Sequence, residues 1–228
     1  MQDQQADLEW QDNGVPVSNR FDDPYFSVDN GLEETQHVFL AGNDLPARFC
    51  DGFHVAELGF GTGLGFLTTV QAWMKSGVQG HLHFTSFEAF PMTASEMARA
   101  LSAFPELAEL VAPLVQLWVG KAQPIQYAPN ITLEVILGDA RQTLPDWNDK
   151  ADAWFLDGFS PAKNPELWTP ELMQAVASHT TPTGTAATYT AAGFVRRGLR
   201  DAGFHVERIA GYGRKRHMTV AEFGASTE

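Results

Sequence analysis

A glycine-rich turn between a strand-like and a helix-like segment limits the folds open to this chain. Residues 54–58 are short and mostly apolar, and the sequence then reads Gly59-Phe-Gly-Thr-Gly63, with glycines at alternate positions. Glycine allows a sharp turn and lets the backbone approach a ligand closely. Apolar residues follow with the i, i+3, i+4, i+7 spacing of a helix that buries one face, at Phe66, Leu67, Val70, Trp73 and Met74. The segment predicts a strand–turn–helix unit with a ligand at the turn.

The rest of the chain repeats this alternation, which predicts an α/β fold with a mostly parallel sheet. We expect further strands at residues 81–87, 131–137, 153–156 and 185–190, and helices at residues 93–104, 106–118, 141–144, 166–178 and 193–202. Two last strand-like runs, residues 204–209 and 217–223, are joined too briefly for a helix and must be antiparallel. A seven-stranded Rossmann-like sheet with a C-terminal antiparallel hairpin is the architecture of class I methyltransferases. We expect one such domain at residues 51–228, with residues 1–50 as an N-terminal extension packed on it.

Details of the turn discriminate between cofactors. The dinucleotide fingerprint G-x-G-x-x-G needs a third glycine that no frame here supplies, and a phosphate-binding loop needs a lysine that the turn lacks. The pattern E-x-G-x-G-x-G, from Glu57 to Gly63, fits S-adenosylmethionine, whose ammonium and sulfonium groups favour nearby carboxylates. Glu57 is expected to act there directly or through water. The turn residues expected to contact the cofactor are Gly59, Phe60, Gly61, Thr62 and Gly63.

Acidic residues also follow the second and third expected strands. Glu88 ends the second strand, where a carboxylate can accept hydrogen bonds from both ribose hydroxyls. Asp139 ends the third strand beside Ala140 and can accept from the adenine amino group. Each acid alone could equally be a solvated strand-end residue or a helix cap. Their placement after successive strands favours a cofactor site.

The segment 152–168, around the expected fourth strand, is the most distinctive of the chain. In a doubly wound sheet the end of this strand lies beside the first strand, so Asp157 is expected to point into the site beside the methyl group of the cofactor. Phe159 lies past the strand end, where an aromatic ring can stack on a flat substrate. Prolines 161 and 165 restrict the residues before them and hold Lys163 and Asn164 in a defined loop.

Four segments in the same order resemble one protein family. They are FDDPYFSVDNGLEETQHVFL, ELGFGTGLGFL, DGFSPAKNPELW and GFVRRGLRDAGF followed by GYGRKRHM. Together they are similar to the methyltransferase domain of the bifunctional tRNA wobble-uridine modification proteins of the MnmC family and to its stand-alone (MnmD-like) relatives. The similarity runs from about residue 16 to residue 223.

This resemblance implies methyl transfer from S-adenosylmethionine to the primary amine of 5-aminomethyl-(2-thio)uridine at the tRNA wobble position. The product would be the 5-methylaminomethyl form. Bifunctional members continue into a flavin-dependent oxidoreductase domain, whereas this sequence ends at Glu228, so we expect no FAD in this chain. Leu58 and Gly65 also differ from the turn of bifunctional members, although both suit a tight cofactor loop.

The distribution of charge bears on a nucleic-acid partner. The net charge is −13, which by itself argues against a polyanion. Residues 191–217, however, carry seven basic and two acidic side chains, a local charge of +5, so the other 201 residues carry −18. A local basic region on an acidic protein can form an anion-binding face. The candidate contacts to the tRNA anticodon loop are Lys163, Arg196, Arg197, Arg214, Lys215 and Arg216, while exposed charges kept for solubility are the alternative, favoured for Arg200 and Arg208.

Composition limits the cellular setting. One cysteine, Cys50, excludes an internal disulfide and a thiolate metal cluster, and we expect no metal site. No apolar stretch approaches the ~20 residues needed to cross a bilayer, and the acidic, amide-rich N-terminus is unlike a signal peptide. We therefore expect a cytoplasmic protein without a membrane partner. The sequence leaves the oligomeric state open and is compatible with a monomer.

Asp157 is the expected catalytic residue. An alkylammonium has no lone pair, so the site must bind it, release its proton and align it with the methyl carbon; Asp157 would anchor the amine and accept the proton. The wobble base would enter the site unstacked, as single-stranded RNA bases are usually read. One alternative is a methyltransferase of the same fold acting on a small-molecule or protein amine. The other is a cofactor-binding or scaffold protein without catalysis, against which the Asp157 segment argues.

Overall fold

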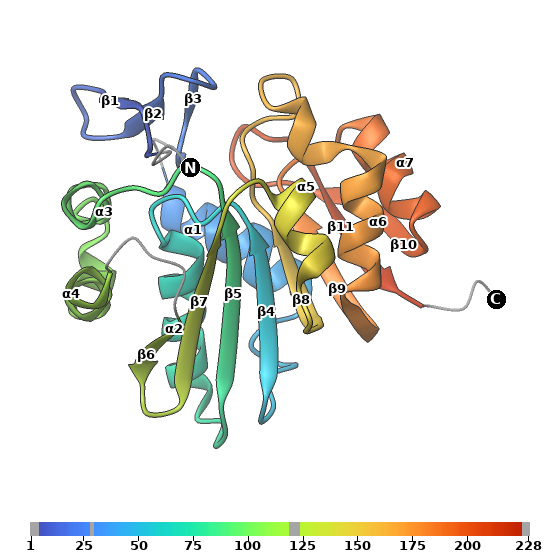
Figure 1. Ribbon diagram of the computed structural model, residues 1–228, viewed down its shortest axis with the longest axis horizontal. Coiled ribbons are helices and arrows are strands. Elements are labelled where there is room, and N and C mark those ends of the chain that lie inside the picture. Colours follow the sequence, from blue (N-terminus) through green and yellow to red (C-terminus); the bar gives the residue numbers. More distant parts are fainter. Residues whose placement is uncertain (1–4, 28–29, 119–123, 225–228) are drawn as a thin grey trace.

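The computed structural model describes residues 5–27, 30–118 and 124–224, and an eight-stranded sheet forms their centre (Figure 1). The strand order is β10-β11-β9-β8-β4-β5-β7-β6. The bounds are β4 Phe53–Leu58, β5 Leu82–Glu88, β6 Ile125–Ala128, β7 Ile131–Leu137, β8 Ala151–Leu156, β9 Thr180–Thr188, β10 Phe204–Ala210 and β11 His217–Phe223. β4, β5, β7, β8 and β9 pair in parallel, whereas β11 is antiparallel to both β9 and β10. The predicted mostly parallel sheet and C-terminal hairpin are confirmed.

All seven predicted strands are present, and one edge strand was missed. β6 has four residues and pairs antiparallel with β7 across a register shift. A strand this short gives too few alternations for a period-2 pattern to be recognised. β9 begins at Thr180 rather than at residue 185, and its pairing with β8 shifts register after Ala151.

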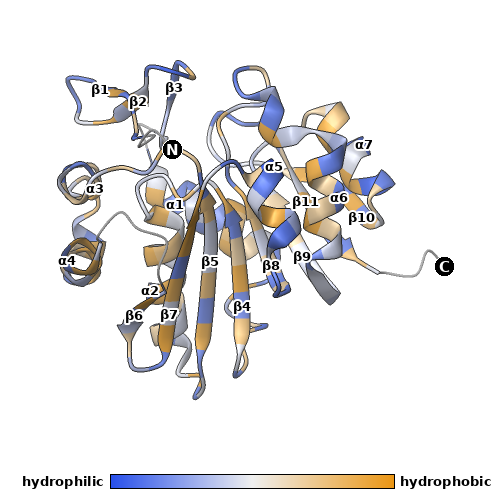
Figure 2. Cartoon of the chain, in the orientation of Figure 1, coloured by the Kyte–Doolittle hydropathy of each residue, from blue (hydrophilic) through white to orange (hydrophobic). Residues whose placement is uncertain are grey.

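Helices cover both faces of the sheet. The bounds are α1 Gly31–Thr35, which continues into a π-helical turn Gln36–Leu40, α2 Leu64–Ser76, α3 Ala94–Leu101, α4 Ala108–Leu117, α5 Ala140–Thr143, α6 Pro170–Ser178 and α7 Gly193–Asp201. One buried cluster packs α1 to α4 on one face, and a second packs α5 to α7 on the other. Figure 2 shows the apolar residues concentrated on the strands between these layers. Among the described helices, none has the length and hydropathy to span a membrane.

The predicted helix 166–178 is in fact two elements. A 3-10 turn, Pro165–Trp168, precedes α6, and Thr169 between them is extended with φ −70° and ψ 152°. Pro170 disfavours the helical conformation at the residue before it. The side chain of Thr169 accepts a hydrogen bond from the backbone N–H of Leu172, so the break serves as an N-cap.

The first part of the chain forms a small sheet above the carboxyl ends of the central strands (Figure 1). Three short antiparallel strands, β1 Leu8–Trp10, β2 Pro16–Ser18 and β3 Asp23–Pro24, make up this sheet. Residues 31–49 then bury apolar side chains such as Val38 and Phe39 in the same core cluster as α2. The N-terminal residues therefore lie partly over the central sheet and partly within its core.

Candidate cofactor and substrate site

The glycine turn connects β4 to α2 at the point where β4 and β8 lie side by side. Gly59 has φ +94°, and a Cβ on it would collide with the carbonyl oxygen of Asp157. The register pairs Leu58 with Leu156, so Gly59 and Asp157 follow directly from neighbouring strand ends. Gly65 in α2 also has no room for a side chain, because a Cβ added there would collide with the carboxylate of Glu57. Close approach of backbone to backbone and to carboxylate thus explains why glycine is required at both positions.

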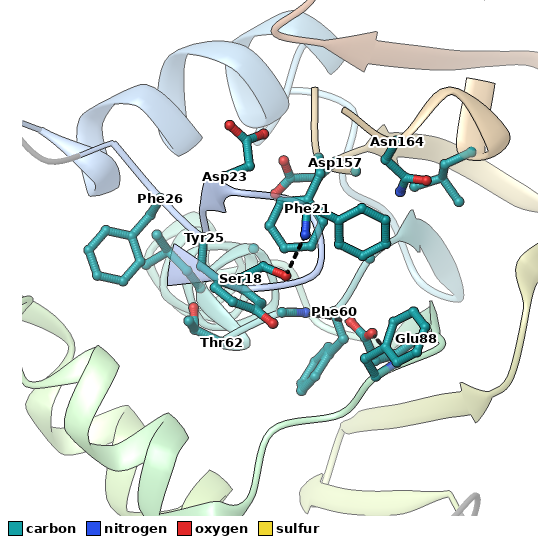
Figure 3. A pocket seen from close by; sticks show the side chains of 18 of the residues that line it. Ser18, Phe21, Asp23, Tyr25, Phe26, Phe60, Thr62, Glu88, Asp157 and Asn164 are labelled. Atoms are coloured by element: carbon teal, nitrogen blue, oxygen red, sulfur yellow. Dashed lines mark hydrogen bonds between the residues drawn. The ribbon is translucent and has the colours of Figure 1, made fainter. Parts of the chain in front are cut away.

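A cavity with a volume of about 2100 Å³ opens at the carboxyl ends of the central strands. Ligand pockets usually measure about 300–1,000 Å³, so this cavity has room for a cofactor and part of a larger substrate. Its lining includes the turn residues Gly59, Phe60, Gly61 and Thr62. Figure 3 shows Asp157, Asn164 and Glu88 around it together with the aromatic rings of Phe21, Tyr25 and Phe60. Ligand binding at this edge is typical of open α/β sheets.

Glu57 is almost fully buried, whereas Glu88 lines the cavity. Glu57 is 1% exposed and accepts a 2.8 Å hydrogen bond from the Ser86 hydroxyl. Burial, together with the charges of Asp157 and Glu88, raises its pKa well above the ordinary value. Glu88 lines the cavity and accepts backbone hydrogen bonds from Gly61 at 2.9 Å and from Phe90 at 2.7 Å. Burial raises the pKa of Glu88, and these backbone N–H groups oppose that rise.

Asp139 and Ala140 line the cavity at the end of β7. Asp139 caps α5 by accepting from the backbone N–H of Arg141 at 2.9 Å. Its carboxylate also accepts from the guanidinium of the same arginine, at 2.6 Å for the nearest pair, and this bond lowers the pKa of Asp139. Arg141 reaches Glu166 as well, at 3.1 Å. The helix-cap interpretation of Asp139 therefore holds in the structure, and its adenine contact stays a prediction.

Asp157 projects into the cavity from the end of β8. Its backbone N–H donates to the carbonyl of Leu58 at 3.2 Å, which ties the segment to the glycine turn. Asp157 lines the cavity and is partly exposed there, and burial raises its pKa to about 7. Lys215 lowers that pKa and Glu34 raises it. A carboxyl group with a pKa near neutrality can exchange a proton with a substrate.

The loop after β8 packs against the N-terminal sheet. Phe159 stacks on Phe21 with ring centres 4.8 Å apart and meets Tyr25 edge-on at 5.0 Å. The ammonium of Lys163 donates to the backbone and side-chain oxygens of Asp22. Phe159 and Lys163, predicted to contact substrate, are thus already engaged with the N-terminal segment.

The predicted basic contacts separate into two groups. Arg214 and Lys215, in the loop between β10 and β11, line the cavity. Arg196 and Arg197 lie on α7, and Arg216 is exposed in the same loop as Lys215. Only the first group is brought to the cavity in the described part of the chain, and the RNA-binding role of all five stays a prediction.

Several cavity residues were missed from the sequence, among them Tyr25, Glu34 and Tyr189. Tyr25 and Glu34 belong to the N-terminal segment that carried the family resemblance, which was the one available signal. Tyr189 follows β9, and its ring lies 4.1 Å from the ammonium of Lys215. No group of three or more His, Cys, Asp or Glu side chains suited to a metal occurs within residues 5–27, 30–118 and 124–224.

The sheet order, the glycine turn and the acidic cavity define a class I methyltransferase. Residues 105–223, more than half of the chain, match the family model described as S-adenosyl-L-methionine-dependent methyltransferase. The chain therefore belongs to the S-adenosyl-L-methionine-dependent methyltransferases.

Individual proteins within this class are similar to the chain in sequence and in structure. The chain is 46% identical, over 230 residues and 96% of its length, to the "tRNA 5-methylaminomethyl-2-thiouridine biosynthesis bifunctional protein MnmC" of Hahella chejuensis, and 47% identical, over 95% of its length, to the protein of the same name from Aeromonas hydrophila. It spans 37% and 35% of those proteins. The crystal structure of MNMC2 from Aquifex aeolicus matches 99% of this chain and 72% of its own, with a TM-score of 0.75 and 25% identity.

Proposed function

We propose that this protein methylates the primary amine of 5-aminomethyl-(2-thio)uridine at the tRNA wobble position, giving the 5-methylaminomethyl form. The observation that carries the proposal is the 46% identity, over 96% of this chain, to a protein named for 5-methylaminomethyl-2-thiouridine biosynthesis. The region responsible is residues 51–228, and described residues of the N-terminal extension, such as Phe21 and Tyr25, line part of the cavity. A tRNA substrate and the exposed thiol of Cys50 fit a reducing cytoplasm.

The residues present fit S-adenosylmethionine. Gly59 and Gly61 bring the backbone of the turn to the cavity wall, whereas Gly63 faces the side chains of Leu114 and Met97. Carboxylates, including those of Glu88 and Asp157, line the space that a sulfonium and an ammonium would enter. Glu88 would hold the ribose, Asp139 and Ala140 the adenine, and Glu57 the ammonium through water. The cofactor, when bound, supplies an electrophilic methyl group. The turn lacks the third glycine of the dinucleotide fingerprint, which supports methyl transfer without a flavin in this region.

Asp157 would orient and deprotonate the amine. A primary alkylammonium that enters the cavity would pair with the Asp157 carboxylate. This pairing would lower the pKa of Asp157 below its value in the free protein. Its oxygen would then accept the proton as the nitrogen lone pair turns toward the methyl carbon. Because a free-protein pKa of about 7 lies close to physiological pH, the same group can hold the ammonium and release the proton to solvent after turnover.

The basic loop between β10 and β11 would meet the phosphates of the anticodon loop. Arg214 lines the cavity and Arg216 is exposed beside it. Lys163, Arg196 and Arg197 would extend the contact along the loop after β8 and along α7. Phosphate contacts release counterions, so binding should weaken steeply with salt.

The alternative substrate is a small-molecule or protein amine. The internal ion pairs of Lys163 with Asp22 and of Lys215 with Glu34 favour it, since both lysines are engaged within the protein. Mass spectrometry of wobble nucleosides, before and after incubation of 5-aminomethyluridine tRNA with protein and cofactor, separates the two. We expect a gain of one methyl group at the wobble nucleoside. Methylation of free amines with none on tRNA would contradict the proposal.

A further inference from the structure

A cluster of Glu34, Tyr189 and Lys215 forms one wall of the cavity beside Asp157. The ammonium nitrogen of Lys215 lies 2.7 Å from a carboxylate oxygen of Glu34 and 4.1 Å from the centre of the Tyr189 ring. A carboxylate and an aromatic face are two kinds of group that bind alkylammonium ions in proteins. The cluster therefore already holds a primary alkylammonium, that of the lysine.

Glu34 and Lys215 differ in their exposure and in the elements that carry them. The Glu34 side chain is 12% exposed and lies on α1, within the core layer, whereas the Lys215 side chain is 45% exposed and comes from the loop between β10 and β11. The Tyr189 ring is fixed because its hydroxyl donates to the carbonyl of Gly158 at 2.7 Å. The carboxylate and the ring are thus rigid parts of the wall, and the lysine is the partner that can leave.

The Glu34 carboxylate needs a cation as its partner. Lys215 is paired with Glu34, whereas Asp23 lies 3.7 Å from the ammonium of Lys163. A buried carboxylate left without a partner is costly, so Glu34 can release Lys215 only to another cation. A substrate ammonium meets that condition, whereas a substrate that carries a carboxylate at the same place would be repelled by the carboxylate of Glu34.

We infer that Glu34 and the face of Tyr189 form the binding site for the substrate's primary ammonium beside Asp157, that Lys215 is its exchangeable occupant in the free protein, and that Glu34 rejects amines bearing a carboxymethyl group. The inference rests on the proposed function and adds the residues that select its substrate. Asp157 exchanges the proton, and Glu34 sets which amine reaches it.

The first test compares binding of two tRNAs, one with 5-aminomethyluridine and one with 5-carboxymethylaminomethyluridine, to wild type, Glu34→Gln and Glu33→Gln in the presence of S-adenosylhomocysteine. Glu33 is exposed on the same helix and controls for loss of one charge. The preference for the aminomethyl tRNA should fall roughly tenfold in Glu34→Gln, because one charged hydrogen bond to the ammonium and one repulsion are removed together. It should be unchanged in Glu33→Gln. An unchanged preference in folded Glu34→Gln would overturn the inference.

A second variant keeps the test decisive if Glu34→Gln does not fold. Lys215→Gln removes the resident ammonium at a half-exposed position, and free 5-aminomethyluridine, which has no phosphate, serves as the probe. It should bind several-fold more tightly to this variant than to wild type, since no lysine competes. Equal or weaker binding would contradict an exchangeable occupant. If wild type methylates neither tRNA, the proposed function fails; if it methylates the aminomethyl tRNA and both variants behave as wild type, only this inference fails.

Discussion

Replacing Asp157 with asparagine is expected to stabilise the fold at neutral pH while it removes methyl transfer. The pKa of Asp157 is raised from an ordinary 3.8 to about 7 by burial at the end of β8. One pKa unit corresponds to about 1.4 kcal/mol, so ionisation of this carboxyl costs the native state about 4 kcal/mol once the pH exceeds about 7. Asparagine has nearly the same shape and never ionises, so it avoids this cost.

The direction in which stability changes with pH depends on whether the native or the unfolded state holds the proton of Asp157. At pH values below about 4 the carboxyl is protonated in both native and unfolded protein, and the two variants should differ little. Between pH values of about 4 and 7 the native state keeps the proton that the unfolded state has lost, so the stability of wild type falls by about 1.4 kcal/mol per pH unit relative to the variant. The difference then becomes constant above about pH 7.

Urea denaturation of wild type and Asp157→Asn at several pH values between 4 and 8 measures this difference. The exposed Asp12→Asn variant is the matched control for loss of one carboxylate. In parallel, kcat/KM of wild type should rise with pH through an inflection near pH 7, and Asp157→Asn should bind cofactor without turnover. A free-energy difference between wild type and Asp157→Asn that is the same at every pH would refute the reasoning.

Three further substitutions test the turn and the nucleic-acid face. Gly59→Ala should lose cofactor binding, measured by calorimetry, and about 1–3 kcal/mol of stability, because the added Cβ meets the Asp157 backbone. Gly52→Ala is the control, since Gly52 has φ +77° and open space around it, and it should show only the effect of backbone strain in thermal denaturation. Arg216→Ala should lower the slope of log affinity for tRNA against log salt by about 1 if it neutralises one phosphate, and an unchanged slope would remove it from the interface. Phe194 is 45% exposed on α7, two residues before Arg196, and Phe194→Ala should weaken tRNA binding severalfold through lost base stacking. Met74→Ala, at 52% exposure on α2, should not, and equal effects of the two substitutions in a binding assay would contradict this role.

The fold could be predicted from the sequence because its signals are local and repeated. Five parallel strands alternate with helices whose apolar faces recur at helical spacing, and the short connection after residue 209 permits only an antiparallel return. β6 was missed because four residues at a sheet edge give almost no periodic signal. Pro170 marks the break before α6, because proline disfavours the helical conformation at Thr169, although the apolar spacing continues across it.

Acidic residues of the candidate site were predicted where they follow from strand ends, and Arg214 and Lys215 because of the local basic charge. Glu88, Asp139 and Asp157 reach one cavity because each lies at the carboxyl end of a parallel strand or within two residues after it. Glu34 and Tyr189 could not be found in this way, because they meet only after α1 and the end of β9 pack beside the β10–β11 loop. The stacking of Phe159 on Phe21 is equally non-local, since it joins segments separated by more than half the chain.

The central claim is tested most directly by incubating the protein and methyl-labelled S-adenosylmethionine with two tRNAs that differ only in the wobble side chain. The label should enter the tRNA with 5-aminomethyluridine, and digestion should release 5-methylaminomethyluridine. The tRNA with 5-carboxymethylaminomethyluridine should stay unlabelled. Protein that binds the cofactor and labels neither tRNA, or labels both equally, would contradict the account.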